Sequence, residues 1–192
     1  RSDPAAALLS GVQNADAPPR MNVFLVGPMG SGKSAVGRQL AQRLNLEFID
    51  SDAEIEARTG VDIAYIFERE GEAGFRSREA EVIDALSRRD RVLVSTGGGA
   101  ILDVGTRERL RARGRVVYLR TSVDQQLART RRSNDRPLLN NDDPRGTLER
   151  LFEQRAPLYT EVAEFVVDTD GRKVKAVVDQ ICQRLVADGR EP

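Results

Sequence analysis

A glycine-rich segment near the start of the chain ends in Lys-Ser and has the spacing of a phosphate-binding loop. It reads Gly27-Pro28-Met29-Gly30-Ser31-Gly32-Lys33-Ser34, which matches G-x-x-x-x-G-K-[ST] in full. Glycines let backbone N–H groups converge on an anion with no Cβ in the way. Lys33 can reach the β- and γ-phosphates, and the Ser34 hydroxyl can ligate Mg²⁺. The segment predicts binding of Mg-ATP, with contacts from Gly30, Ser31, Gly32, Lys33, Ser34 and Ala35.

Two carboxylates flank a serine in Asp50-Ser51-Asp52, at the end of the second apolar run. Residues two apart in an extended chain share a face, so both carboxylates can enter the crevice beside the phosphate loop. Asp50 is expected to hold Mg²⁺, through water, since this ion keeps part of its hydration shell. Asp52 is expected to orient an acceptor hydroxyl and take its proton. The alternative is that Ser51 or Asp52 caps the next helix.

Three further groups of residues are candidates for binding the acceptor. Gly97, Gly98 and Gly99 follow the third apolar run, where glycines indicate either a sharp turn or close approach to a ligand. Arg76 and Glu79 are neighbours on one helical face, which favours either a surface ion pair or a guanidinium fork for a substrate carboxylate. Arg155 precedes Pro157, which is expected to end its helix there.

Two arginine-rich runs need separate interpretations. Residues 130–146 contain Arg131, Arg132 and Arg136 in a stretch too polar to pack, with Arg129 just before it. This composition predicts a mobile lid that closes over polyphosphate, with a solvated charge run as the alternative. The alternating arginines of 107–115 are interrupted by an acidic residue and lack interleaved aromatics, so they are interpreted as a solvated helix face.

Short apolar runs alternate with longer amphipathic stretches from Met21 onward, as in βα units. Strands are expected at Asn22–Val26, Glu47–Ile49, Arg91–Ser95, Arg115–Leu119 and Phe165–Val167. Parallel strands joined by right-handed crossovers predict a three-layer α/β/α sandwich with a five-stranded parallel sheet. Ligands in such sheets bind at the carboxyl ends of the strands, which is where the candidate residues fall.

The segment between the second and third strands contains more helix than one crossover needs. Helices are expected at Asp52–Arg58, Asp62–Glu70 and Glu72–Arg89, with Gly60 and Gly71 as stops. Residues 52–89 are therefore interpreted as a substrate-binding insertion rather than a separate domain. Apolar stripes also predict a helix after the first strand and another at the C-terminal end, with Cys182 as a buried or half-buried filler beside the latter.

The bulk composition narrows the classes of function. The chain has 192 residues, which fits a single domain at 21–192, preceded by a flexible extension at 1–20. Thirty Lys and Arg balance thirty Asp and Glu, which gives no basis for nucleic-acid or anionic-membrane partners. Histidine is absent, which excludes His-based catalysis. The lone cysteine and the lack of a long apolar run favour the cytoplasm.

The ordered set of motifs resembles the shikimate kinase family, small P-loop enzymes of aromatic amino-acid biosynthesis. The resemblance rests on the phosphate loop, Asp50-Ser51-Asp52, Gly71-Glu72 leading to Phe75-Arg76, Thr96-Gly97-Gly98-Gly99, Arg136-Pro137-Leu138-Leu139, and Arg155 with Pro157-Leu158-Tyr159. It implies the nucleoside monophosphate kinase variant of the P-loop NTPase fold. It also implies transfer of the γ-phosphate of ATP to the 3-hydroxyl of shikimate. Nothing in the sequence demands more than a monomer.

The same resemblance implies a role for each candidate residue. Asp52 would meet the shikimate hydroxyls as base, and Gly97, Gly98 and Gly99 would line the ring. Arg76 and Arg155 would bind the carboxylate with Glu79 in support. Arg136 would reach the transferring phosphate, and Arg129 would lie over adenine. Residue chemistry alone leaves open a gluconate-type or nucleotide-type kinase, and a regulatory nucleotide-binding module without turnover.

Overall fold

The structure is a computed structural model that describes residues 21–130 and 142–187. Its centre is a five-stranded sheet in the order β2-β3-β1-β4-β5, and all neighbouring strands are parallel. The strands are β1 Val23–Val26, β2 Glu47–Asp50, β3 Val92–Ser95, β4 Arg115–Arg120 and β5 Phe165–Asp168. The predicted five-stranded parallel sheet is confirmed, with every strand boundary within one residue of its expected place.

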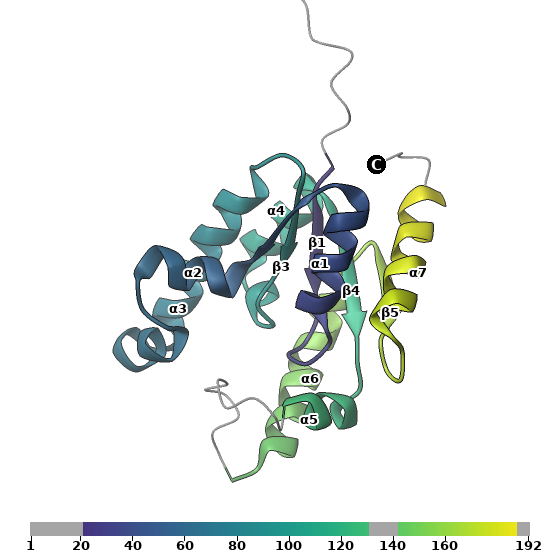
Figure 1. Ribbon diagram of the computed structural model, residues 1–192. Helices are drawn as coiled ribbons and strands as arrows, with labels where there is room; N and C mark the ends of the chain where they lie inside the picture. The colour runs from purple at the N-terminus through teal and green to yellow at the C-terminus, as the bar shows by residue number, and fades with distance from the viewer. Residues whose placement is uncertain (1–20, 131–141, 188–192) are drawn as a thin grey trace, which may run out of the picture.

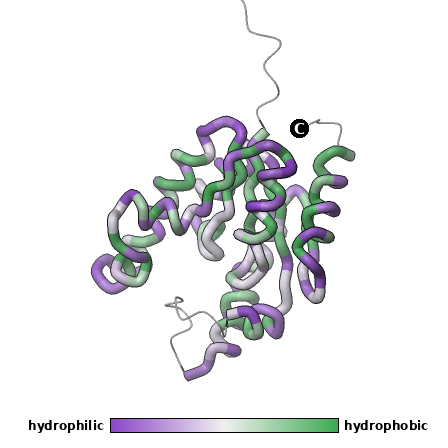
Figure 2. Tube along the Cα trace, viewed as in Figure 1, coloured by the Kyte–Doolittle hydropathy of each residue, from purple (hydrophilic) through white to green (hydrophobic). Residues whose placement is uncertain are grey.

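Helices cover both faces of the sheet and make the predicted three layers (Figure 1). Along β1 the side chains alternate: Phe24 and Val26 enter one buried cluster, and Val23 and Leu25 enter the other. The second cluster is closed by α1 Lys33–Leu44 and α7 Val174–Ala187. The first is closed by α2 Ser51–Thr59, α3 Ile63–Ser87, α4 Val104–Arg113 and α6 Pro144–Val162. Figure 2 shows the resulting pattern, with hydrophobic strands inside and helices that alternate between hydrophobic and hydrophilic residues.

The helical region after β2 breaks where the sequence predicts. Helix α2 ends at Gly60, whose φ of 73° is left-handed, a conformation that glycine adopts without steric cost. Within α3 the backbone of Gly71 is non-helical, with φ 71° and ψ −177°. The two stops are confirmed, and they divide the region into three helical pieces that extend beyond the edge of the sheet (Figure 1).

The prediction that Pro157 ends its helix is wrong. Helix α6 continues through Pro157 to Val162, and its C-cap is Ala163. An internal proline costs about 3 kcal/mol because it removes a hydrogen bond and crowds the preceding turn. Tyr159 and Val162 are 1% and 2% exposed in the core beneath the sheet, and burial of such large side chains offsets that cost.

The interpretation of 107–115 as a solvated face is also wrong for most of its arginines. Arg107 donates to the carbonyl of Ile101 at 2.7 Å, and Arg113 donates to the Asp84 carboxylate of α3 at 2.7 Å. Arg115 is 5% exposed and pairs with Glu164. These side chains fix α4 and β4 to their neighbours, which sequence spacing alone does not reveal.

Two short elements complete the fold, the 3-10 helix η2 Ala100–Leu102 and helix α5 Val123–Thr130. The predicted lid at 130–146 falls largely on 131–141, so Arg131, Arg132 and Arg136 lie outside the described residues, as does the extension at 1–20. Cys182 is half-buried beside the apolar stripe of α7, as predicted. Among the described residues, no helix is both long and apolar enough to cross a membrane.

Candidate active site

The phosphate loop joins the central strand β1 to the first turn of α1. Gly30 and Gly32 have φ of 75° and 89°, which lies in the left-handed region where a side chain would be strained. Helix α1 begins directly after Gly32, which makes no side-chain cap, and its first turn holds no acidic residue. Its N-terminal N–H groups and the positive end of its dipole therefore face the loop, which is an arrangement suited to phosphate.

The Lys33 side chain folds back over its own loop. Its Nζ donates to the carbonyl oxygens of Gly27 at 2.7 Å and Pro28 at 2.8 Å. These are carbonyl partners that an anionic phosphate can replace more favourably, because a charge-assisted hydrogen bond is about twice as strong as a neutral one. The ammonium group is thus held at the loop, close to where a β- or γ-phosphate would bind.

Asp50 connects the phosphate loop to the start of α2. Its Oδ2 accepts from the Ser34 hydroxyl at 2.9 Å. Its Oδ1 accepts from the backbone N–H groups of Asp52 at 3.0 Å and Ala53 at 3.2 Å, so the cap of α2 is Asp50 and not Ser51 or Asp52. A hydroxyl and a carboxylate oxygen in contact beside the loop are hard oxygen donors that fit Mg²⁺.

Asp52 lies in the first turn of α2 and is half-buried, with its Oδ1 atom buried near Gly97. A Cβ added to Gly97 would come within 2.9 Å of Asp52 Oδ1 and would overlap Glu79 Oε1. Burial, followed by the charges of Glu79 and Asp50, raises the pKa of Asp52 from 3.8 to about 6, against the opposing effect of Lys33 and Arg76. A carboxylate with a pKa near neutrality is suited to accept a proton.

A cluster of charged side chains lies behind the turn that follows β3. Arg76 donates to Glu79 Oε2 at 2.7 Å, and Glu79 is 2% exposed, so the alternative of a surface ion pair is wrong. Burial raises the pKa of Glu79, although the charges of Arg76 and Arg155 oppose this rise. Arg155 is 4% exposed, and the Nε atoms of Arg76 and Arg155 are buried without a partner in the described part of the chain. Such unsatisfied donors are suited to an incoming anion.

Gly97, Gly98 and Gly99 are required for close approach rather than for backbone conformation. None of the three has a positive φ. A Cβ at Gly99 would overlap the Arg76 guanidinium, and one at Gly98 would lie 3.6 Å from both Arg155 Nη1 and the Tyr159 hydroxyl oxygen. The structure therefore favours the second of the two sequence interpretations, in which side chains and ligands lie directly on the glycine backbone.

Arg129 joins the phosphate loop to the segment after β5. Its Nη1 donates to the Gly30 carbonyl at 2.8 Å, and its Nη2 donates to the Thr169 carbonyl at 3.4 Å. The neighbouring Asp170 accepts from the Thr121 hydroxyl at 2.6 Å, which ties the same segment to the start of α5. The Arg129 guanidinium thus lies against the phosphate loop, in the lining of the cleft described next.

These elements enclose one polar cleft of about 380 Å³ at the carboxyl ends of β1, β2 and β3. Its lining comprises Met29, Gly30, Gly32, Lys33, Ser34, Ala35, Asp50, Asp52, Ser95, Thr96, Gly97, Gly98 and Arg129. Arg76, Glu79 and Arg155 lie behind the glycine turn and are not part of this lining. The cleft and the adjoining charged cluster therefore contain every described candidate except two: Ser31, which is buried within the loop, and Gly99, which lies against the Arg76 guanidinium.

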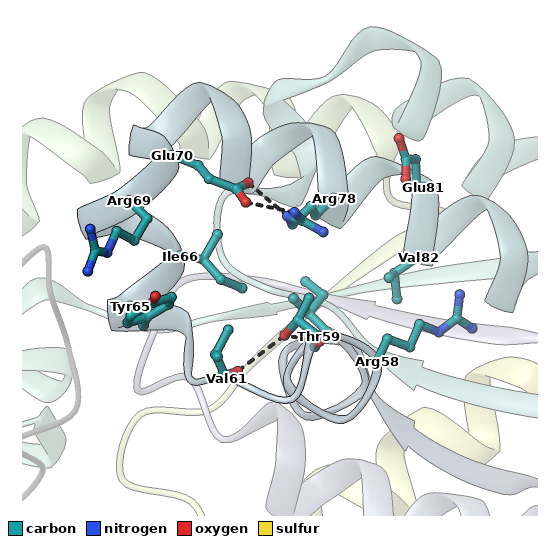
Figure 3. Close-up of a pocket in the computed structure, with 11 residues that line it drawn as sticks. Arg58, Thr59, Val61, Tyr65, Ile66, Arg69, Glu70, Arg78, Glu81 and Val82 are labelled. Atoms are coloured by element: carbon teal, nitrogen blue, oxygen red, sulfur yellow. Dashed lines mark hydrogen bonds and ion pairs between the residues drawn. The ribbon is translucent and has the colours of Figure 1, made fainter.

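A second cavity, of about 520 Å³, lies between α2 and α3 (Figure 3). It is lined by none of the residues that the sequence singles out for chemistry. Two of its arginines already have carboxylate partners: Arg78 donates to Glu70 at 2.6 Å across the cavity, as Figure 3 shows, and Arg58 donates to Glu54, outside the lining, at 2.8 Å. Size alone would therefore select the wrong cavity, and the chemistry of the lining selects the smaller cleft.

Sequence reasoning missed the buried residues that support the glycine turn. Ser51 is fully buried and its hydroxyl accepts from the Gly97 N–H at 3.0 Å, a contact hidden by its position between two carboxylates. Tyr159 reaches the same turn from α6 and donates to the Gly98 carbonyl. The available signal for Tyr159 was its position four residues after Arg155, which places both on one helical face.

A phosphate loop between the central strand of a parallel sheet and the following helix defines a P-loop nucleotide-binding protein. The family described as shikimate kinase matches residues 29–186. A shikimate kinase from Shewanella oneidensis is 56% identical over 166 residues, which cover 86% of this chain and 97% of the relative. The chain belongs to the shikimate kinase family.

Solved structures agree with this assignment. A shikimate kinase from Acinetobacter baumannii in complex with shikimate superposes with a TM-score of 0.87 at 46% identity, covering 89% of this chain and 96% of that one. A deoxyadenosine kinase from M. mycoides with bound dATP, at 14% identity, has a TM-score of 0.56 and covers 86% of this chain and 99% of that one. The second likeness concerns the fold alone.

Proposed function

We propose that the protein transfers the γ-phosphate of ATP to the 3-hydroxyl of shikimate, giving shikimate 3-phosphate and ADP. The observation that carries this proposal is the half-buried carboxylate of Asp52, which shares a cleft with Lys33 and adjoins two arginines whose Nε atoms are buried. Each part of the reaction therefore has a matching group. Lys33 matches the phosphates of the donor, Asp52 matches the hydroxyl that receives the phosphate, and the two guanidinium groups match the carboxylate of the same substrate. Membership of the shikimate kinase family and the likeness to a homologue that binds shikimate support the same substrate.

The triphosphate is bound by the phosphate loop and the start of α1. Backbone N–H groups of Gly30 to Ala35 surround the β-phosphate, and Lys33 exchanges its carbonyl partners for phosphate oxygens. Arg129 extends from the Gly30 carbonyl toward Thr169, where it lies against the adenine. We also assign Arg136, outside the described residues, to the transferring phosphate, where a guanidinium stabilises the charge of the transition state.

Ser34 and Asp50 are the residues that would hold Mg²⁺. Their oxygens are 2.9 Å apart, and no group of three or more His, Cys, Asp or Glu side chains suited to a metal occurs in 21–130 and 142–187. This suits an ion that takes most of its ligands from phosphate and water. Held by Ser34 and Asp50, Mg²⁺ would neutralise part of the charge of the phosphate groups.

Asp52 orients the acceptor hydroxyl and receives its proton. In a loose transition state for phosphoryl transfer the proton moves late, so the main contribution of the carboxylate is to aim the oxygen at phosphorus. Its raised pKa of about 6 makes it a better proton acceptor than an ordinary aspartate, while it stays ionised at pH 7.

Arg76 and Arg155 bind the carboxylate of shikimate. Each unpartnered Nε group can donate one charge-assisted hydrogen bond, so the two arginines together can bind both oxygens of a carboxylate. Glu79 holds Arg76 in place at 2.7 Å and compensates part of the buried positive charge. The backbone of Gly97, Gly98 and Gly99 forms the wall against which the ring packs.

The test is acceptor-dependent release of ADP in a coupled assay with shikimate, gluconate and nucleoside monophosphates. Release with shikimate is expected, and activity with gluconate alone would exclude the proposal. Binding of Mg-ATP without acceptor-dependent release would instead indicate a regulatory module. In Asp52→Asn, turnover should be lost while ATP affinity is retained, because Asp52 acts chiefly in the transition state.

We further propose that 21–192 forms one kinase domain, with 52–89 as its substrate-binding region and 130–146 as its lid. In support, the α2–α3 region packs on the common core through Ile55 and Val82 instead of forming a core of its own. A monomeric protein in the cytoplasm fits the single, half-buried Cys182, since reducing compartments do not rely on disulfides.

A further inference from the structure

Two buried tyrosines stack on each other beneath the glycine turn. The rings of Tyr118 on β4 and Tyr159 on α6 have centroids 4.9 Å apart and an interplanar angle of 29°, and each side chain is 1% exposed. Their hydroxyl groups differ. Tyr159 donates to the Gly98 carbonyl, whereas the Tyr118 hydroxyl is buried without a hydrogen-bond partner among the described residues.

The bond from Tyr159 reaches a part of the backbone that lines the cleft. Gly98 is half-buried and belongs to the lining, and a Cβ at this position would lie 3.5 Å from the Met29 amide of the phosphate loop. On the other side of the turn, the Gly97 N–H donates to Ser51 at 3.0 Å. The turn is thus held from α2 through the Thr96–Gly97 peptide group and from α6 through the Gly98–Gly99 peptide group.

Tyr159 also lies close to Arg155, one helical turn earlier on α6. Both the Tyr159 hydroxyl oxygen and Arg155 Nη1 lie 3.6 Å from the same added Cβ at Gly98. A change in the orientation of the Gly98 peptide would therefore alter two groups that are proposed to contact shikimate. One is the glycine backbone, and the other is the Arg155 guanidinium beside it. The nucleotide contacts of Lys33 and Ser34 lie on a different segment, with partners of their own.

From this arrangement we infer that Tyr159 is a positioning residue for the acceptor, acting through the Gly98 carbonyl and Arg155 without touching the substrate. The inference rests on the proposed function of the cleft. It predicts that the phenol hydroxyl matters more for shikimate than for ATP. The stacked ring contributes packing, and the hydroxyl contributes the orientation of the peptide.

The test compares Tyr159→Phe with Tyr118→Phe. Each variant removes one hydroxyl from the same stacked pair and keeps the ring, so fold and packing are matched. Loss of one neutral hydrogen bond, with its effect on Arg155, is expected to raise the KM for shikimate about 3- to 10-fold in Tyr159→Phe. The KM for ATP should remain within about 2-fold of wild type, and both constants should be unchanged in Tyr118→Phe.

Three results would overturn the inference: a shikimate KM and kcat unchanged in Tyr159→Phe, equal changes in the two variants, or an ATP KM that rises as much as the shikimate KM.

A second measurement separates this failure from failure of the proposed function. With ¹⁵N-glycine labelling, the amide resonance of Gly99, whose peptide group contains the Gly98 carbonyl, should shift in Tyr159→Phe and not in Tyr118→Phe, with or without substrate. An absent shift refutes the positioning role even if shikimate is turned over, whereas a wild-type protein inactive on shikimate refutes the proposed function alone.

Discussion

Replacement of Asp52 by Asn should remove activity and at the same time stabilise the fold. Burial and the charges of Glu79 and Asp50 raise the pKa of Asp52 from 3.8 to about 6, so its ionised form is less favourable in the folded chain than in the unfolded one. Between these two pKa values the folded chain binds more protons. The free energy of unfolding therefore falls as the pH rises from about 4 to about 6, and it remains lower above that pH.

The size of the effect follows from the two pKa values. The difference between 3.8 and about 6, at about 1.4 kcal/mol per pKa unit, corresponds to a cost of about 3 kcal/mol at pH 7. Asparagine carries no charge, and its amide can donate to the Glu79 carboxylate that lies against the same glycine. We expect Asp52→Asn to be about 1–3 kcal/mol more stable than wild type at pH 7, since the amide must still be buried.

Urea unfolding at pH 7, 6 and 5 measures this difference directly. The gap between variant and wild type should be largest at pH 7 and should shrink toward pH 5, where the wild-type carboxyl becomes protonated. The control is Asp124→Asn, whose side chain is 80% exposed and pairs with Arg145 at 2.8 Å. Such a surface pair is worth about 0–1 kcal/mol, so the control should follow the pH profile of wild type.

Two results would refute the reasoning. A variant that is less stable than wild type at pH 7 would mean that the ionised Asp52 is favourably paired in the folded state. A stability gap that is the same at pH 5 and pH 7 would mean that Asp52 does not titrate in this range. Either result would also weaken its role as a proton acceptor with a raised pKa.

Three further predictions concern catalysis. Below about pH 6 the kcat/KM for shikimate should fall up to 10-fold per pH unit as Asp52 becomes protonated, and a flat profile down to pH 5 would contradict this. In Gly97→Ala the new Cβ overlaps the buried Glu79 carboxylate, so a loss of roughly 100-fold in kcat/KM is expected. The control is Gly105→Ala, whose Cβ meets only the ends of side chains at 3.3 Å, and its kcat/KM should be near that of wild type. Arg76→Ala should raise the shikimate KM by about 10- to 100-fold through loss of a charged hydrogen bond, with little change in the KM for ATP. The control is Glu72→Gln, which alters an exposed partner of Arg76 at 3.3 Å and should change the shikimate KM only slightly.

The sheet and the phosphate loop were predictable because their signals are local. Unbroken apolar runs mark strands covered on both faces, and all five were placed within one residue. The loop glycines have a requirement set by their own backbone angles, with Gly30 at 75° and Gly32 at 89°. Gly60 and Gly71 end helical pieces for the same reason.

The roles of individual charged and polar side chains were decided by tertiary structure. Asp50 is the cap of α2 as well as the partner of Ser34, and spacing alone could not distinguish it from its neighbours. The spacing of Arg76 and Glu79 left a surface ion pair open, yet Glu79 is 2% exposed, because the glycine turn after β3 packs over it. The proline in α6 is tolerated because the residues after it are buried by other elements.

The sequence by itself determined that this chain forms a parallel α/β sheet with a triphosphate-binding loop, since backbone preference and apolar periodicity belong to contiguous residues. Tertiary structure decided which side chains surround the cleft and in what electrostatic state. Burial and the partners that shift a pKa come from segments far apart in the chain, such as Asp52 and Glu79 meeting at Gly97. A side chain's solvation is a property of the folded molecule.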